Sequence, residues 1–185
     1  MKLLLHTCCA PCSAYCIDYL RGEKIEPDLY WYNPNIHPYT EYKNRKDTLE
    51  EYAKDINVKT IFEDDYGLKE FVKNVSADLE NRCNYCYKVR LEKTAKYAKE
   101  NGYDTFSTTL LVSPYQKHEA IKAIGEALAK EYDINFLYID FREGFREGQS
   151  KARDVGMYMQ KYCGCIFSEE ERYQKGEKRG QTSFN

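Results

Sequence analysis

The sequence predicts a three-layer α/β domain in which a mostly parallel sheet is covered by helices on both faces. Short apolar runs alternate with segments of helical periodicity about five times along the 185 residues, and this alternation is typical of a parallel sheet. The length fits one domain of ~150 residues with a small extension. Hydrophobic residues make up 42% of the chain and charged residues 31%, which indicates a packed core rather than disorder.

The first half of the chain contains three expected strands, each a short apolar or β-branched run, over residues 2–6, 28–32 and 58–62. Apolar residues at helical spacing predict the helices that follow them, over 11–20, 39–54 and 66–75. Pro11 stands in the first turn of the first helix, where its missing N–H costs little.

The second half continues the alternation, with strands expected over 105–111 and 136–141 and helices over 85–100, 115–132 and 150–160. The helix over 85–100 ends at Asn101-Gly102, a usual C-terminal stop. We expect residues 1–168 to form a single catalytic domain. Residues 169–185 carry many charges and are predicted to form a helical or frayed C-terminal tail.

The charge balance excludes a binder of nucleic acid that works by overall charge. Lys and Arg number 28 and Asp and Glu number 30, which gives a net charge of −2; a local basic patch remains compatible with this balance. No run approaches the ~20 apolar residues of a membrane helix, and the apolar start at residues 1–5 is too short for a signal peptide. We therefore expect a cytoplasmic protein, in which eight cysteines indicate metal, cluster or redox chemistry rather than structural disulfides.

Seven of the eight cysteines fall into three groups, namely Cys8, Cys9 and Cys12, then Cys83 and Cys86, then Cys163 and Cys165. Thiolates are soft ligands for iron and zinc, and the first two groups are expected at helix starts, where the helix dipole favours thiolates. The spacing is compatible with an iron–sulfur cluster, a zinc site or thiol redox chemistry. The remaining Cys16 is predicted to be a small buried thiol.

The third cysteine group has one glycine between its two thiols. Such a pair can form a strained, reducible disulfide or supply two further metal ligands. Ligands of parallel sheets bind beyond the carboxyl ends of the strands, and Cys8 and Cys9 directly follow the first expected strand. Asp140 and Arg142 end the fifth one. Asp140 is a candidate metal ligand or proton donor and Arg142 a candidate anion ligand, unless the two form an ion pair with each other.

The three histidines have different expected roles. His6 is expected to be a packed, hydrogen-bonded core residue, His37 a ligand candidate in a surface loop over 32–38, and His118 a helix cap. Cations on the long helix and the tail suit either a solvated face or contact with RNA phosphates; they are Lys88, Arg90, Lys93, Lys96 and Lys99, and then Arg172, Lys175, Lys178 and Arg179.

Six motifs in order resemble the QueH family of cobalamin-independent epoxyqueuosine reductases. They cover residues 6–13, 32–38, 82–91, 107–116, 140–142 and 162–165, and the resemblance extends from residue 3 to about residue 168. It implies an oxidoreductase that reduces epoxyqueuosine in tRNA to queuosine, the last step of queuosine biosynthesis. It also implies a PP-loop/HUP-like Rossmann-type fold.

The resemblance further implies a [4Fe-4S] cluster with an additional mononuclear iron beside it. Cys8, Cys9, Cys83 and Cys86 match the cluster ligands, and Cys163 and Cys165 match a redox-active catalytic pair. Cys12 and Asp140 are the candidates for the second iron, and Asp140 is also a candidate catalytic residue. We expect no cobalamin. We also expect no ATP, because cysteines 8, 9 and 12 occupy the place of the phosphate-binding turn and no glycine-rich phosphate loop is present.

Two alternatives from other classes remain at this point. The first is a zinc-binding RNA module without catalytic activity, which would contain zinc and leave RNA unchanged. The second is a thiol–disulfide oxidoreductase that uses Cys163 and Cys165 without a metal. The position of the first cysteine group at a strand end favours an enzyme over the zinc module, and the presence of three cysteine groups favours a metalloenzyme over the thiol oxidoreductase.

Overall fold

A computed structural model describes the backbone of residues 1–181 and the side chains of residues 1–174. Its centre is a five-stranded sheet in the order β3-β2-β1-β4-β5, and every neighbouring pair is parallel. The strands are β1 (Leu3–His6), β2 (Pro27–Trp31), β3 (Thr60–Phe62), β4 (Thr105–Thr108) and β5 (Asn135–Phe136). The predicted parallel α/β architecture is therefore confirmed.

The core is built around β1, the central strand of the sheet. Leu3, Leu4 and Leu5 are buried on both faces of the sheet, as expected for a parallel sheet with helices on each side. Leu5 lies opposite Leu29 of β2 and Ser107 of β4. The chain places β2 and β3 on one side of β1 and then β4 and β5 on the other side. In such folds ligands bind at the carboxyl ends of the strands where the order switches, which here is between β1 and β4.

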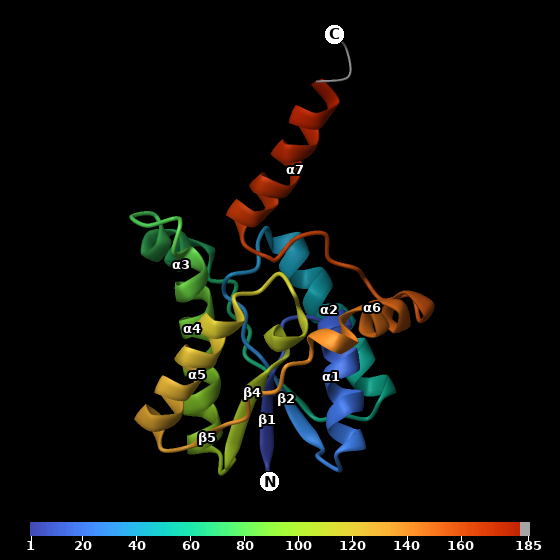
Figure 1. The fold of residues 1–185 in the computed structure, drawn as a ribbon, viewed down its shortest axis with the longest axis vertical. Coiled ribbons are helices and arrows are strands. Elements are labelled where there is room, and N and C mark those ends of the chain that lie inside the picture. The colour runs from blue at the N-terminus through green and yellow to red at the C-terminus, as the bar shows by residue number, and fades with distance from the viewer. Residues whose placement is uncertain (182–185) are drawn as a thin grey trace.

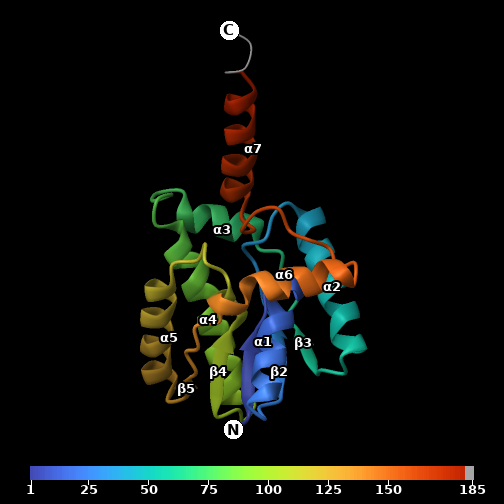
Figure 2. The same ribbon diagram turned by 45° about the vertical axis from the view of Figure 1, so that its right-hand side comes forward.

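The helices form one layer on each face of the sheet. They are α1 (Ala10–Gly22), α2 (Tyr39–Asp55), α3 (Leu68–Val75), α4 (Arg82–Glu100), α5 (His118–Tyr132), α6 (Phe145–Asp154) and α7 (Ile166–Gln181). Figure 1 shows α4 and α5 together on one side of the strands and α1, α2 and α6 on the other. The turned view in Figure 2 keeps this separation and shows α7 rising away from the sheet. No helix in the described residues has the length and apolar character needed to cross a bilayer.

The predicted strand over 58–62 is shortened to β3, Thr60–Phe62, and the two strands of the second half are shortened more. β4 ends at Thr108, whose hydroxyl accepts a hydrogen bond from the Leu110 amide and turns the chain into a short 3-10 helix, η1 (Thr109–Val112). β5 comprises only Asn135–Phe136, the two residues that pair with Thr105 and Phe106 of β4. The chain beyond it stays beside β4 through separate bonds, such as that from the Ser107 hydroxyl to the Leu137 carbonyl, and leads to a second 3-10 helix, η2 (Arg142–Gly144).

The prediction of a helix over 150–160 is wrong in position, since α6 begins at Phe145 and ends at Asp154. Its early start depends on Gly144, where an added Cβ would lie 2.1 Å from the Tyr15 ring, so that only glycine permits this close packing on α1. Its early end is fixed by Gly156, which has a positive φ of 72°, and by the Met157 amide bonded to the Ala152 carbonyl. These are features of a Schellman C-cap.

Helix α4 also begins earlier than predicted, at Arg82 rather than Tyr85. Cys83, which the predicted boundary placed before the helix, therefore lies in its first turn, and Cys86 lies one turn further along. Helix α5 begins later, at His118, and α7 begins at Ile166, before the boundary expected for the tail. The side chains of Lys175, Lys178 and Arg179 in that tail lie outside the described residues.

Candidate metal and redox centre

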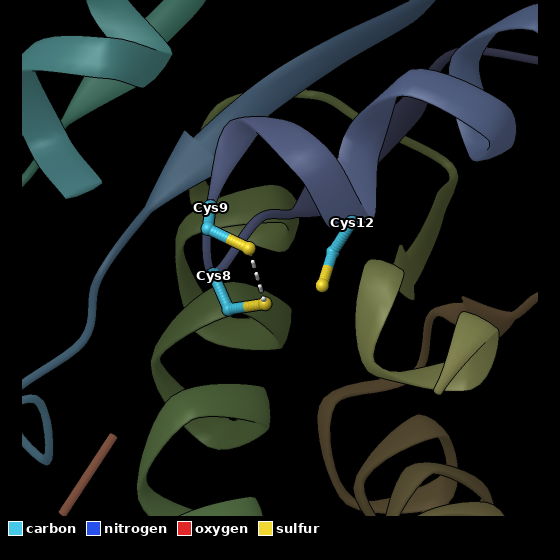
Figure 3. Close-up of side chains that lie close together, drawn as sticks. All are labelled: Cys8, Cys9 and Cys12. Carbon is cyan, nitrogen blue, oxygen red and sulfur yellow. Dashed lines mark hydrogen bonds between the residues drawn. The ribbon is translucent and has the colours of Figure 1, made fainter. Parts of the chain in front are cut away.

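Three cysteines converge at the carboxyl end of the central strand. Cys8 and Cys9 connect β1 to α1, where Cys9 is the N-cap residue, and Cys12 lies in the first turn of that helix. Their Sγ atoms all lie within 4.8 Å of one another, and those of Cys8 and Cys9 are 3.7 Å apart. Figure 3 shows the three sulfurs turned toward a common point. We call Cys8, Cys9 and Cys12 the thiol trio.

The three thiols of the trio differ in acidity. Hydrogen bonds from Cys12 and Cys9 hold the pKa of Cys8 well below its usual value, and His6 and Arg90 lower it further. Burial raises the pKa of Cys9, and hydrogen bonding to Cys8 raises that of Cys12. Cys8 therefore loses its proton most readily of the three. Since a soft metal replaces protons on such ligands, the trio fits a metal or cluster.

A second pair of thiols lies on α4. Cys86 is buried beside Cys165, Phe71 and Val75, and burial raises its pKa. Cys83 is half-buried and packs against the main core, with a pKa raised by burial and then by the charge of Cys163. In the described part of the chain, this pair does not join the trio at metal-ligand spacing. The assignment of Cys8, Cys9, Cys83 and Cys86 to one cluster stays a prediction.

The third cysteine group lies on the loop that joins α6 to α7. Cys163 is exposed and Cys165 is buried, and both are free thiols. The residue between them must be glycine, because Gly164 has a φ of 149° and an added Cβ would lie 3.3 Å from Ile36 Cγ1. The Gln116 amide donates a hydrogen bond to the Cys163 sulfur over 3.3 Å.

A buried arginine holds this loop against the body of the protein. Arg45 on α2 donates to the carbonyls of Tyr162 and Cys163, each over 2.9 Å, and to the Glu41 carboxylate over 2.7 Å. Its side chain is 1% exposed. Although burial lowers the pKa of Arg45, the charges of Cys9 and Glu41 raise it above its usual value. The arginine therefore stays charged between the loop and the trio.

Asp140 and Arg142 form an ion pair with each other. Arg142 Nε donates to Asp140 Oδ1 over 2.8 Å, and the guanidinium lowers the pKa of Asp140 to about 2. Both side chains are solvent-accessible, and Asp140 is not among the residues that line the cavity described below. A role for Asp140 in catalysis or in binding a second iron stays a prediction.

Two of the three expectations about the histidines are wrong, namely the surface position of His37 and the capping role of His118. His6 is buried as predicted, with Nδ1 2.9 Å from Thr108 Oγ1. His37 is also fully buried rather than on a surface loop, because its carbonyl accepts from the Tyr162 hydroxyl over 2.6 Å and the loop covers it. His118 is the first residue of α5 and does not cap it; its Nε2 lies 3.1 Å from the Ser113 carbonyl. Cys16 is fully buried, as predicted.

The thiols open onto a cavity of about 760 Å³. Cys8, Cys12 and Cys163 contribute to its lining, so one space reaches both the trio and the exposed member of the third cysteine group. We call Cys163 and Cys165 the loop pair. Gln160 also lines it and donates to Cys9 Sγ over 3.0 Å and to Cys12 Sγ over 3.5 Å.

Two residues of this site, Gln160 and Arg45, could not be identified from the sequence pattern. Nothing local to either residue signals its role. Gln160 reaches the trio from a position 148 residues after Cys12, and Arg45 looks like one more charge on a solvated helix.

Comparisons with known proteins agree with the motifs. The family model for epoxyqueuosine reductase QueH matches residues 3–171. A protein named Epoxyqueuosine reductase QueH from Dehalococcoides mccartyi is 41% identical over 94% of this chain and 96% of its own length. Proteins of the same name from Thermotoga maritima and Staphylococcus aureus are 34% and 36% identical, over 94% and 90% of this chain and 93% and 75% of their own.

A solved structure with a related fold comes from Methanocaldococcus jannaschii and is titled a predicted subunit of tRNA methyltransferase. It superposes with a TM-score of 0.53 at 15% identity, over 81% of this chain and 76% of that one. At this identity the likeness concerns the fold alone, and it supports the Rossmann-type arrangement.

Proposed function

The chain belongs to the epoxyqueuosine reductase QueH family, and we propose that its thiol-lined cavity reduces epoxyqueuosine in tRNA to queuosine, the last step of queuosine biosynthesis. The observation that carries this proposal is the buried thiol trio at the carboxyl end of β1, open to a cavity of about 760 Å³. A cavity of that size suits a modified nucleoside. Removal of the epoxide oxygen as water takes two electrons and two protons.

The donor set of the site fits an iron–sulfur cofactor. The trio offers three soft ligands, of which Cys8 has the lowered pKa, and Arg45 and Arg90 supply buried positive charge nearby. We assign Cys8, Cys9, Cys83 and Cys86 as ligands of a [4Fe-4S] cluster, and Cys12 with Asp140 as ligands of an additional iron. When bound, these groups supply single electrons and a Lewis acid for the epoxide oxygen.

The loop pair can release as many electrons as the reaction consumes. Oxidation of Cys163 and Cys165 to a disulfide releases two electrons and two protons, which equals what the epoxide consumes as it becomes an alkene and water. Cys163 is exposed in the cavity while Cys165 is buried behind it. An external reductant of the dithiol or one-electron carrier class must then restore the pair.

The test is an anaerobic preparation followed by metal analysis and an epoxyqueuosine-tRNA assay. We expect a brown protein with about four to five irons and four sulfides per chain that forms queuosine. Cys83→Ala should lose sulfide and activity, whereas Cys16→Ala, which removes a buried thiol outside the assigned ligands, should keep both. A colourless protein with one zinc after reconstitution would contradict the proposal and favour the zinc module. Cys163→Ser with full multiple-turnover activity would exclude a role for the loop pair.

A further inference from the structure

The cavity has a charge composition unlike that of the chain. Cations and carboxylates nearly balance overall, at 28 and 30. The residues that line the cavity include no carboxylate but five cations, namely Arg45, Arg146, Arg153, Lys161 and Arg172. A concave surface with one sign of charge focuses the field on its opening and attracts the opposite charge.

Four of these five cations are available to a ligand. Arg45 is buried and occupied by Glu41 and the loop carbonyls. The other four are exposed, and none of them forms an ion pair within the part of the chain that the structure describes. We call Arg146, Arg153, Lys161 and Arg172 the cationic rim.

The cations predicted on the long helix α4 contrast with the rim. Lys93 pairs with Glu63 and Lys99 with Asp133, while Arg90 is buried and bonded to the Cys86 carbonyl. These side chains neutralise carboxylates or hold the core. Within the described residues, four unpaired cations line this one cavity, whereas on α4 the one exposed cation without an ion pair is Lys88.

Helix α6 presents one continuous polar face to the cavity. Arg146, Gln149, Ser150 and Arg153 all line it, and their spacing of three and four residues puts them on one side of a helix. The opposite side is buried against α1 through Gly148 and Ala152. The packing of α6 thus fixes two guanidinium groups, with hydrogen-bonding side chains between them, toward the opening.

An aromatic pair stands at the same opening. Tyr115 is 84% exposed and meets the Phe145 ring edge-to-face at 5.9 Å between centroids, and both line the cavity. A large aromatic side chain left in water offers a face for base stacking, which suits an unpaired nucleotide. Guanidinium groups complement phosphate oxygens in pairs of hydrogen bonds.

We propose that the cationic rim and Tyr115 form the docking surface for a single-stranded RNA loop. The loop phosphates contact Arg146, Arg153, Lys161 and Arg172, and an unpaired base stacks on Tyr115, which places the nucleotide to be modified over the thiols. The inference rests on the proposed function, because it assigns how the tRNA of that reaction enters the cavity. The docking surface requires an RNA that offers unpaired bases as well as phosphates.

The test measures RNA binding separately from the reduction of epoxyqueuosine. A fluorescein-labelled, unmodified anticodon stem-loop RNA is titrated with protein at several KCl concentrations, and anisotropy reports the dissociation constant. Arg146→Ala/Arg153→Ala should weaken binding about ten-fold or more and make the salt slope shallower by roughly 1.4–1.8, the value for two phosphate contacts. The matched control is Lys24→Ala/Lys130→Ala, which removes two charges that also lack an ion pair in the described residues, one just after α1 and one in the last turn of α5, neither of them at the cavity.

Equal weakening by both double variants, or no weakening by the rim variant, would overturn the docking surface. For the stacking residue, Tyr115→Ala should weaken binding roughly ten-fold while Tyr115→Phe keeps it; equal affinity of all three proteins would exclude the stack. A blunt RNA duplex should bind more weakly than the stem-loop, and equal binding would exclude entry of an unpaired loop.

This outcome is separable from that of the proposed function. Iron and sulfide contents of the rim variants should equal those of the unaltered protein, since none of the rim residues is an assigned ligand. If the unaltered protein forms queuosine and the rim variants bind RNA normally, the docking surface is wrong and the function stands. If the rim variants lose RNA binding but the unaltered protein forms no queuosine, the docking surface stands and the function is wrong.

Discussion

Cys8 and Cys12 of the thiol trio and Cys163 of the loop line the same cavity, yet the chain holds the two groups in different ways. The trio follows the central strand and starts α1, so its position is set by the sheet and by the first helical turn. Cys163 and Cys165 lie on an irregular loop that Arg45 and His37 hold through backbone bonds. The trio is buried at the start of a helix, which suits a metal. The loop pair includes an exposed thiol, which suits redox exchange.

The largest expected effect comes from the arginine that supports the loop. Arg45→Met should destabilise the protein by about 3–5 kcal/mol, because Glu41 is left buried without a counter-charge. Urea unfolding measures this loss. The double variant Glu41→Gln/Arg45→Met should recover part of it, since the uncompensated charge is gone while the loop bonds stay lost. Full stability of Arg45→Met would show that the loop is held by other contacts.

A smaller effect, confined to the loop between α6 and α7, is expected from a change at Gly164. Gly164→Ala forces a side chain onto a φ of 149° and against Ile36, at a cost of roughly 1–3 kcal/mol. We expect alkylation of Cys163 and Cys165 in the metal-free protein to accelerate while that of the trio is unchanged, as read by mass spectrometry of the peptides. Gly22→Ala is the control, since nothing lies within 4 Å of its added Cβ. Equal acceleration in both regions would show that they open together.

Gln160 connects the two regions, because it belongs to the loop and donates to two sulfurs of the trio. Gln160→Leu removes both bonds, and loss of such supporting contacts lowers metal affinity by about 10–100-fold. A chelator competition on the loaded protein measures this change, and voltammetry should show a lower reduction potential. Gln149→Leu, which lines the cavity without a bond to sulfur, should change neither. Unchanged affinity in Gln160→Leu would separate the loop from the metal ligands.

The smallest effect, counted per pH unit, concerns the histidine beneath the loop. Burial lowers the pKa of His37 to about 4 from about 6.5 in the unfolded chain. Between these values the unfolded chain binds more protons, so stability is complete above about pH 6.5 and falls toward pH 4, by at most about 1.4 kcal/mol per pH unit. Urea midpoints across this range should fall less steeply in His37→Gln than in the unaltered protein. Identical slopes would contradict a neutral buried His37.

Much of the architecture and the position of the first cysteine group could be predicted from local signals. The Leu3–Leu5 run identifies a strand buried on both faces, and the residues after such a strand lie at the ligand-binding edge. Cys8 and Cys9 follow directly and need no distant contact to reach that edge. The burial of Cys16 follows in the same way from its place one turn after Cys12 on a core helix.

The errors have a shared physical cause, which is dependence on contacts distant in sequence. The start of α6 depends on how closely Gly144 approaches Tyr15, and the exposure of His37 depends on a loop more than 120 residues later, as its bond to Tyr162 shows with a separation of 125. A periodic pattern contains no information about such packing. Arg45 shows this dependence most clearly, since a charged residue is buried only where hydrogen-bonding partners surround it.

By itself, the sequence determined the parallel α/β fold, the family and the three groups of thiols, because apolar periodicity and cysteine spacing are local properties of the chain. The tertiary structure alone decided which thiols meet, which cations remain unpaired and which residues support the site. Those outcomes depend on burial and on partners as far apart as Cys9 and Gln160, or Arg45 and Cys163. Such contacts exist only after the sheet and its helices have closed around them.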